Sequence, residues 1–81
     1  MRVAILGGTA GLGRALAVRL AANGIHVVIG SRSEDRGREA ARQVSELTGS
    51  AAVEGKRNEE AVEGAEFVVF AVPYPGMYEV A

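Results

Sequence analysis

Glycines follow the first apolar run of the chain at a spacing that suits phosphate binding. The run Val3–Leu6 leads directly into Gly7-Gly8-Thr9-Ala10-Gly11-Leu12-Gly13, and an alanine-rich apolar segment continues to Asn23. A turn of this kind lets the backbone N–H groups at the start of a helix face an anion, with no Cβ in the way. The pyrophosphate of a dinucleotide is the usual anion at such a turn.

The spacing of these glycines departs from the standard G-x-G-x-x-G pattern. Counting from Gly8 puts Ala10 where the second glycine belongs, whereas counting from Gly7 gives G-x-x-x-G-x-G with Gly7, Gly11 and Gly13 all present. A tight strand-to-helix turn needs glycine with or without a ligand, so the pattern alone is weak evidence. The predicted strand and helix on either side supply the required context. We therefore expect the segment from Gly7 to Gly13 to bind a dinucleotide.

A second group of polar residues follows the predicted second strand. In a dinucleotide-binding fold an Asp or Glu at this strand end bonds the ribose of NAD, whereas a basic residue accommodates the 2′-phosphate of NADP. The sequence here is Gly30-Ser31-Arg32-Ser33, with no acid at the strand end. Ser31 can donate through its hydroxyl, and Arg32 offers a planar fork suited to phosphate. We favour NADP(H) over the plainer interpretation of a solvated surface loop.

Other polar residues give weaker signals. Lys56 and Arg57 follow the weak third strand and are either a loop charge pair or contacts to the adenosine end of the dinucleotide. Tyr74 either borders the nicotinamide or only forms a turn between two prolines. His26, the single histidine, lies at the opposite end of its strand, so we assign no catalytic residue. No acidic or histidine cluster has metal-ligand spacing, and the absence of cysteine excludes thiol chemistry.

Length and composition indicate one small domain. The chain has 81 residues, 48% of them hydrophobic, and a net charge of −1. It is too short for a complete doubly wound fold, and its balanced charge gives no general field for nucleic acid or an anionic membrane. No apolar run approaches the roughly 20 residues of a membrane helix, and the apolar start is too short for a signal peptide. We expect a cytoplasmic location.

Strand and helix patterns alternate along the chain. Strands are predicted over residues 3–6, 25–30 and 67–72, with a weak candidate over 50–54. Helices are predicted over 11–23, from 33 to 48 and from Asn58, as its cap, to Gly64, with another beginning at 77. The run Val27-Val28-Ile29 is typical of a strand covered on both faces. The order βαβαβαβ predicts an α/β fold, a Rossmann-like parallel sheet forming a half-domain with strand order 3-2-1-4.

The second helix has a clear start and end. Ser33 is the predicted N-cap, and Thr48-Gly49 ends the helix. Gly37 inside it costs about 1 kcal/mol relative to alanine. The residues that form its apolar stripe are Ala40, Ala41, Val44 and Leu47.

Four separated blocks of sequence carry a family resemblance. The blocks are Gly7-Gly8-Thr9-x-x-Leu12-Gly13, Ile29-Gly30-Ser31-Arg32, Gly55-x-x-Asn58-Glu59 and Ala71-Val72-Pro73-Tyr74. Together they resemble the N-terminal domain of the deazaflavin-dependent NADP oxidoreductases, which pass a hydride between NADP(H) and the deazaflavin coenzyme F-420. The resemblance extends over the whole chain.

The resemblance implies a role for each matching residue. It implies that the pyrophosphate is held by Gly7, Gly8, Thr9, Leu12 and Gly13. It further implies that the 2′-phosphate is held by Ser31 and Arg32 with help from Arg57, and that the nicotinamide end is lined by Ala71, Val72 and Pro73. The sequence departs from the family at Ala10, usually a glycine, whose methyl group crowds the phosphate.

The resemblance also implies that residues 1–81 are a truncated N-terminal dinucleotide-binding domain of a longer enzyme. Coenzyme F-420 would then bind only with the missing C-terminal part, and we expect this chain alone to be inactive. Short-chain dehydrogenases and prephenate dehydrogenase-like domains share parts of the glycine pattern and stay open as alternatives. An isolated or engineered nucleotide-binding half-domain without turnover is another. We also expect a homodimer through the uncharged edge strand 67–72.

Overall fold

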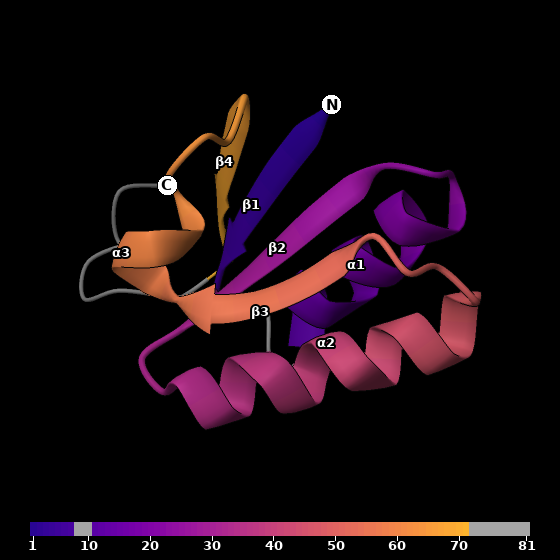
Figure 1. Cartoon of the computed structure of the whole chain (residues 1–81), viewed down its shortest axis with the longest axis horizontal. Helices are drawn as coiled ribbons and strands as arrows, with labels where there is room; N and C mark the ends of the chain where they lie inside the picture. The colour runs from indigo at the N-terminus through magenta and orange to yellow at the C-terminus, as the bar shows by residue number, and fades with distance from the viewer. Residues whose placement is uncertain (8–10, 72–81) are drawn as a thin grey trace, which may run out of the picture.

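Strands and helices alternate along the part of the chain that the computed structural model describes, residues 1–7 and 11–71 (Figure 1). The elements in chain order are β1 (Arg2–Leu6), α1 (Gly11–Ala22), β2 (His26–Ser31), α2 (Glu34–Thr48), β3 (Val53–Arg57), α3 (Asn58–Ala61) and β4 (Phe67–Phe70). This is the predicted βαβαβαβ order. Within these residues, no helix combines the length and the apolar character that crossing a membrane requires.

The strands form one parallel sheet in the order β3-β2-β1-β4. Val27, Val28 and Ile29 in β2 are fully buried, with 0% of their surface exposed. An unbroken β-branched run predicts this burial, because a strand covered on both faces has no solvent side for polar residues. The predicted fold class and strand order are confirmed.

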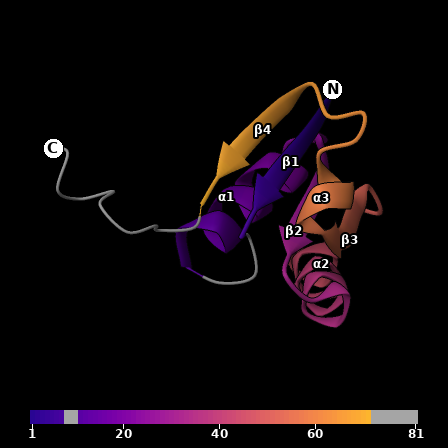
Figure 2. The same cartoon turned by 90° about the vertical axis from the view of Figure 1, so that its left-hand side faces the viewer.

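Helices α1 and α2 cover one face of the sheet, and α3 lies on the other (Figure 2). The larger cluster of buried residues joins β1 and β2 to these two helices and contains Val3, Ile5, Ala17, Ala21, Val27, Ile29, Ala40, Ala41 and Val44. A smaller cluster on the α3 face contains Ala4, Leu6, Val28 and Ala61. Most of the apolar core therefore lies beneath the two central strands, on the side of α1 and α2.

Helix α2 begins and ends where its sequence predicts. The hydroxyl of Ser33 accepts the backbone N–H of Arg36 at 3.4 Å, and Gly49 ends the helix in the left-handed region at φ 72°. Packing explains why residue 37 is a glycine, because an added Cβ would lie 2.9 Å from the carbonyl oxygen of Lys56. The apolar stripe is correct except at Leu47, which is 67% exposed.

Two predicted features are wrong in position. The third strand is Val53–Arg57 rather than 50–54, so Lys56 and Arg57 belong to the strand instead of following it. Asn58 is the first residue of α3 and does not cap it, since the N-cap is Arg57 and makes no side-chain capping bond. The helix predicted to begin at 77 and the last residue of the strand predicted over 67–72 lie outside the described residues.

Candidate functional site

The carboxyl ends of the parallel strands meet at one edge of the sheet, where open α/β folds bind their ligands. Gly7 follows β1 with φ 78°, and its N–H donates to the carbonyl oxygen of Gly30 at 2.8 Å. Gly11, the first residue of α1, has φ 61°. Glycine adopts this left-handed region at little cost, unlike residues with a Cβ. The turn after β1 thus requires glycine on backbone grounds at both of its described ends.

Of the remaining residues of the predicted phosphate-binding turn, the structure describes Leu12 and Gly13. Gly13 is buried in the first turn of α1, whereas Leu12 is 81% exposed. Glycine at a buried position of a helix allows the helix to approach the sheet closely, which is the role of the last glycine in this kind of motif. Gly8, Thr9 and Ala10 lie outside the described residues.

The end of β2 carries the predicted phosphate-binding pair. Ser31 is the last residue of the strand and only 7% exposed, and its hydroxyl oxygen accepts the N–H of Ser33 at 3.3 Å. Arg32 is exposed and forms no ion pair with an acid in residues 1–7 and 11–71. The nearest acid in sequence, Glu34, is in α2 and pairs with Arg38. The guanidinium of Arg32 is therefore available to an external anion.

Arg57 joins this pair through the register of the sheet. As the last residue of β3, it lies directly beside Ser31, and its guanidinium is 3.9 Å from the Glu59 carboxylate. The Arg57 side chain is 57% exposed and the side chain of its partner Glu59 is also exposed, so the arginine remains in contact with solvent. A serine hydroxyl and two arginines thus belong to adjacent strand ends, a donor set suited to a phosphate.

The side chain of Asn58 also lies at this edge of the sheet, a position that the sequence pattern did not predict. Its Oδ1 is buried and has no hydrogen-bond partner among the described residues. A Cβ built on Gly30 would lie 2.8 Å from this oxygen, so the asparagine side chain lies over the end of β2. The residue type suggested a helix cap, and that interpretation hid its position beside the candidate site.

The predicted nicotinamide end follows β4. Ala71 comes directly after the strand, and its N–H donates to the carbonyl oxygen of Leu6 at 2.9 Å. This bond fixes the chain at the carboxyl end of β1, beside the start of the glycine turn. Val72, Pro73 and Tyr74 lie outside the described residues.

The histidine lies at the opposite end of the sheet. His26 Nε2 is 2.5 Å from Glu54 Oε2, and Arg2 also approaches that carboxylate, at 3.5 Å. The hydrogen bond from His26, with smaller effects of Arg2 and Lys56, lowers the pKa of Glu54. Within residues 1–7 and 11–71, no group of three or more acidic or histidine side chains could hold a metal ion.

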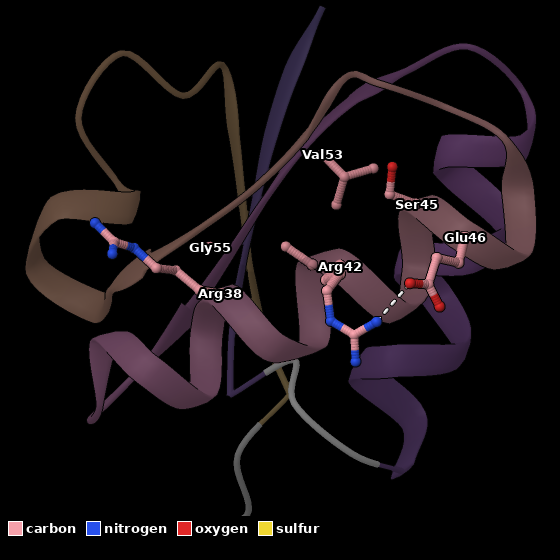
Figure 3. Close-up of a pocket in the computed structure, with 7 residues that line it drawn as sticks. Arg38, Arg42, Ser45, Glu46, Val53 and Gly55 are labelled. Carbon is pink, nitrogen blue, oxygen red and sulfur yellow. Dashed lines mark hydrogen bonds and ion pairs between the residues drawn. The ribbon is translucent and has the colours of Figure 1, made fainter.

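A groove of about 330 Å³ lies between α2 and β3 (Figure 3). Its cations already have partners, because Arg42 pairs with Glu39 and Glu46, and Arg38 pairs with Glu34. The lining residues are Arg38, Ala41, Arg42, Ser45, Glu46, Val53 and Gly55. None of them belongs to the donor set at the strand ends, so this groove is separate from the candidate site.

The parallel sheet, its strand order and the glycine turn after β1 define a Rossmann-like domain. A solved structure of this class, the quinate dehydrogenase from Corynebacterium glutamicum in complex with NAD, matches with a TM-score of 0.75 and 26% identity. The match covers 89% of this chain and 27% of that one. The chain belongs to the family described as NADP oxidoreductase coenzyme F420-dependent, whose model matches residues 2–81.

Curated relatives agree with this family. The F420-dependent NADP reductase of Methanothermobacter thermautotrophicus is 41% identical over 75 residues, covering 90% of this chain and 32% of that protein. The reductase of the same name from Methanocaldococcus jannaschii is 37% identical over 78 residues, covering 91% and 34%. The chain therefore spans about a third of the length of these curated relatives.

Proposed function

We propose that residues 1–81 are the NADP(H)-binding part of an oxidoreductase that transfers a hydride between NADP(H) and a deazaflavin coenzyme of the F420 type. The family supports this proposal, since its description names both partners of the reaction. The chain itself supplies residues for one of the two partners. We keep the prediction that these 81 residues alone do not catalyse hydride transfer, because that step requires two reactive groups positioned against each other.

The observation that carries the cofactor preference is the composition of the strand ends. Ser31, Arg32 and Arg57 present hydrogen-bond donors on the adjacent ends of β2 and β3, and neither strand ends in an acid. A carboxylate would be needed there to accept the ribose hydroxyl of NAD and would repel a 2′-phosphate. Guanidinium groups bind phosphate oxygens through charge-assisted, bidentate hydrogen bonds. The donors present fit NADP(H).

The other contacts that we propose complete the path of the dinucleotide along the carboxyl edge. The turn after β1 would bind the pyrophosphate, and the segment after β4 would border the nicotinamide, the group that carries the hydride when the cofactor is bound. The proposed contacts are Gly7, Gly8, Thr9, Ala10, Gly11, Leu12, Gly13, Ser31, Arg32, Arg57, Ala71, Val72 and Pro73. As part of the same proposal, we place the protein in the cytoplasm, where this cofactor is available in reduced form.

A titration with NADPH and NADH, followed by nicotinamide fluorescence and calorimetry, tests this function. We expect the wild-type chain to bind NADPH more tightly than NADH. Replacing Arg32 by alanine removes a charge-assisted contact worth about 1.5–3 kcal/mol, which lowers NADPH affinity by about 10- to 100-fold. NADH affinity should change little, because NADH has no 2′-phosphate.

Arg19→Ala is the matched control, since Arg19 is an exposed arginine in the last turn of α1, at the other end of the domain. It should leave the binding of both cofactors unchanged. Equal affinity of the wild type for NADPH and NADH would contradict the proposal. The same conclusion would follow if Arg32→Ala left the ratio of the two affinities unchanged.

A further inference from the structure

The side-chain oxygen of Asn58 is a hydrogen-bond acceptor without a donor. Asn58 is the first residue of α3, and its Oδ1 is buried with no hydrogen-bond partner among residues 1–7 and 11–71. Buried polar atoms are nearly always paired in folded proteins, because an unpaired one has lost its bond to water and gained nothing in return. A donor supplied by a bound ligand would restore that bond.

The local structure does not account for this oxygen. An asparagine at a helix start commonly caps the helix with its side chain, but the N-cap of α3 is Arg57 and makes no side-chain bond. The surroundings of Oδ1 are apolar, since a Cβ built on Gly30 would meet this oxygen at 2.8 Å together with the side chains of Leu6 and Ala61. Rotation about the Cβ–Cγ bond of an asparagine is soft, and no hydrogen bond within the described residues holds this oxygen. The oxygen can therefore turn toward an incoming donor.

Asn58 lies between the two groups of residues that we propose bind phosphate. Its oxygen lies over Gly30, whose carbonyl oxygen accepts the N–H of Gly7 at the start of the glycine turn. On the other side, Ser31 follows Gly30, and Arg57 precedes Asn58 and is the register partner of Ser31. In NADP the adenosine ribose is the group that joins the pyrophosphate to the 2′-phosphate. A dinucleotide that spans both groups of residues therefore carries this ribose past Asn58.

The adenosine ribose of NADP has one free hydroxyl, at the 3′ position, because its 2′ oxygen carries the phosphate. A carboxylate would accept that hydroxyl but would also repel the 2′-phosphate, whereas an amide oxygen accepts the same bond without a charge. We propose that Asn58 binds the 3′-hydroxyl of the adenosine ribose through Oδ1 and, being uncharged, is compatible with NADP(H). This inference rests on the proposed function and adds one residue to its contacts.

Calorimetric titration with 2′,5′-ADP and with its 3′-deoxy analogue tests the contact, because the two ligands differ only in the 3′-hydroxyl. We expect the wild type to bind the 3′-deoxy analogue about 2- to 10-fold more weakly, since one neutral hydrogen bond is lost. Asn58→Ala should bind both ligands with the same, reduced affinity. Asn23→Ala is the matched control, because Asn23 is an exposed asparagine after the end of α1 whose side chain bonds the carbonyl oxygen of Arg19. It should discriminate between the ligands as the wild type does.

The intact cofactors separate the role of Asn58 from that of Arg32. NADPH and NADH both carry the 3′-hydroxyl, so Asn58→Ala should weaken both about equally, whereas Arg32→Ala should weaken NADPH alone. Asn58→Asp retains the shape of the side chain and adds a negative charge beside the 2′-phosphate. It should lower the ratio of NADPH affinity to NADH affinity about tenfold. Circular dichroism of each variant verifies that it is folded, and the comparison of the two ADP ligands on the wild type needs no variant.

Equal affinity of the wild type for 2′,5′-ADP and its 3′-deoxy analogue would overturn the proposal. Continued discrimination between them by Asn58→Ala would do the same, because another residue must then hold the hydroxyl. A loss of NADPH affinity alone in Asn58→Ala would assign the contact to the 2′-phosphate instead. In each of these cases the proposed function stands if the wild type still prefers NADPH to NADH. A wild type that binds neither NADPH nor 2′,5′-ADP would overturn both.

Discussion

The two edge strands of the sheet, β3 and β4, differ in how they are protected. β3 carries Glu54, Lys56 and Arg57, and charged side chains hinder the pairing of an edge with another chain. Helix α2 also packs directly on it, backbone against backbone. A Cβ built on Gly55 would lie 2.0 Å from the carbonyl oxygen of Gly37, so only two glycines allow this approach.

β4 has neither kind of protection within the described residues. Its sequence is Phe67-Val68-Val69-Phe70, without charge, and its two phenylalanines are largely exposed. Only Val69 and the following Ala71 pack against the larger apolar cluster. We infer that the free energy of folding depends mainly on the apolar contacts among β1, β2, α1 and α2, which α2 extends to β3, and much less on β4.

The largest effect is expected where α2 meets β3. Gly55→Ala places a methyl group inside the backbone of Gly37, which can be relieved only by separating the helix from the strand. Overpacking a core costs about 1–3 kcal/mol and occasionally more, and we expect the upper end because the opposing atoms are backbone. Small domains have little stability in reserve. The variant should therefore be largely unfolded in circular dichroism and urea titration.

Lys56→Ala is the matched control, since it changes the next residue of β3 and removes only a half-buried side chain. Its midpoint of urea unfolding should stay close to that of the wild type. If Gly55→Ala unfolded at the same urea concentration as Lys56→Ala, then α2 would not be packed on β3 as closely as the structure shows.

Replacing one apolar residue by serine in each edge strand compares how much the two strands contribute to stability. Val53 in β3 packs against the larger apolar cluster, whereas Phe70 in β4 is 71% exposed. Val53→Ser should lower the free energy of unfolding by about 1–2 kcal/mol, because it removes packed methyl groups and introduces a hydroxyl. Phe70→Ser should change it by less than about 0.5 kcal/mol. The measurement is urea unfolding at low protein concentration, and equal losses would contradict the difference between the edges.

These edges also show how far the sequence could predict the fold. The β-branched run in β2 and the alternation of strands and helices were sufficient for the parallel sheet and its order. The position of β3 was missed by three residues, since Val53-Glu54-Gly55-Lys56-Arg57 contains one apolar side chain in five. This segment is a strand because of its pairing with β2 and its contact with α2, and a local sequence pattern does not record such contacts.

The candidate site was predictable where it depends on local sequence and less so where it depends on register. The positive φ angles of Gly7 and Gly11 and the exposure of Arg32 agree with the predicted roles, although cofactor binding itself stays a prediction. Arg57 lies beside Ser31 because β3 ends at Arg57. The sequence pattern predicts the end of that strand three residues too early, so it did not indicate this position. Asn58 was assigned to a helix cap because that is its commonest role, and only its packing over Gly30 shows otherwise.

The smallest effect is expected at the amino end of β3, where Glu54 bonds His26 near Arg2. These neighbours hold the pKa of Glu54 below its ordinary value of 4.5, so its ionised form stabilises the folded state. That contribution is present above the unfolded-state pKa and is lost as the pH falls through the lower folded-state pKa.

Glu54→Gln removes this charge but retains the shape of the side chain. Because the Glu54 side chain is 39% exposed, we expect a loss of less than about 1 kcal/mol at neutral pH. The stability of the wild type should fall more steeply than that of the variant as the pH decreases from about 5 to 3, so the two curves converge. Urea unfolding across this range measures both curves, with Glu46→Gln on the exposed side of α2 as the control. Parallel curves would show that the cluster around Glu54 does not stabilise the β3 edge through its charge.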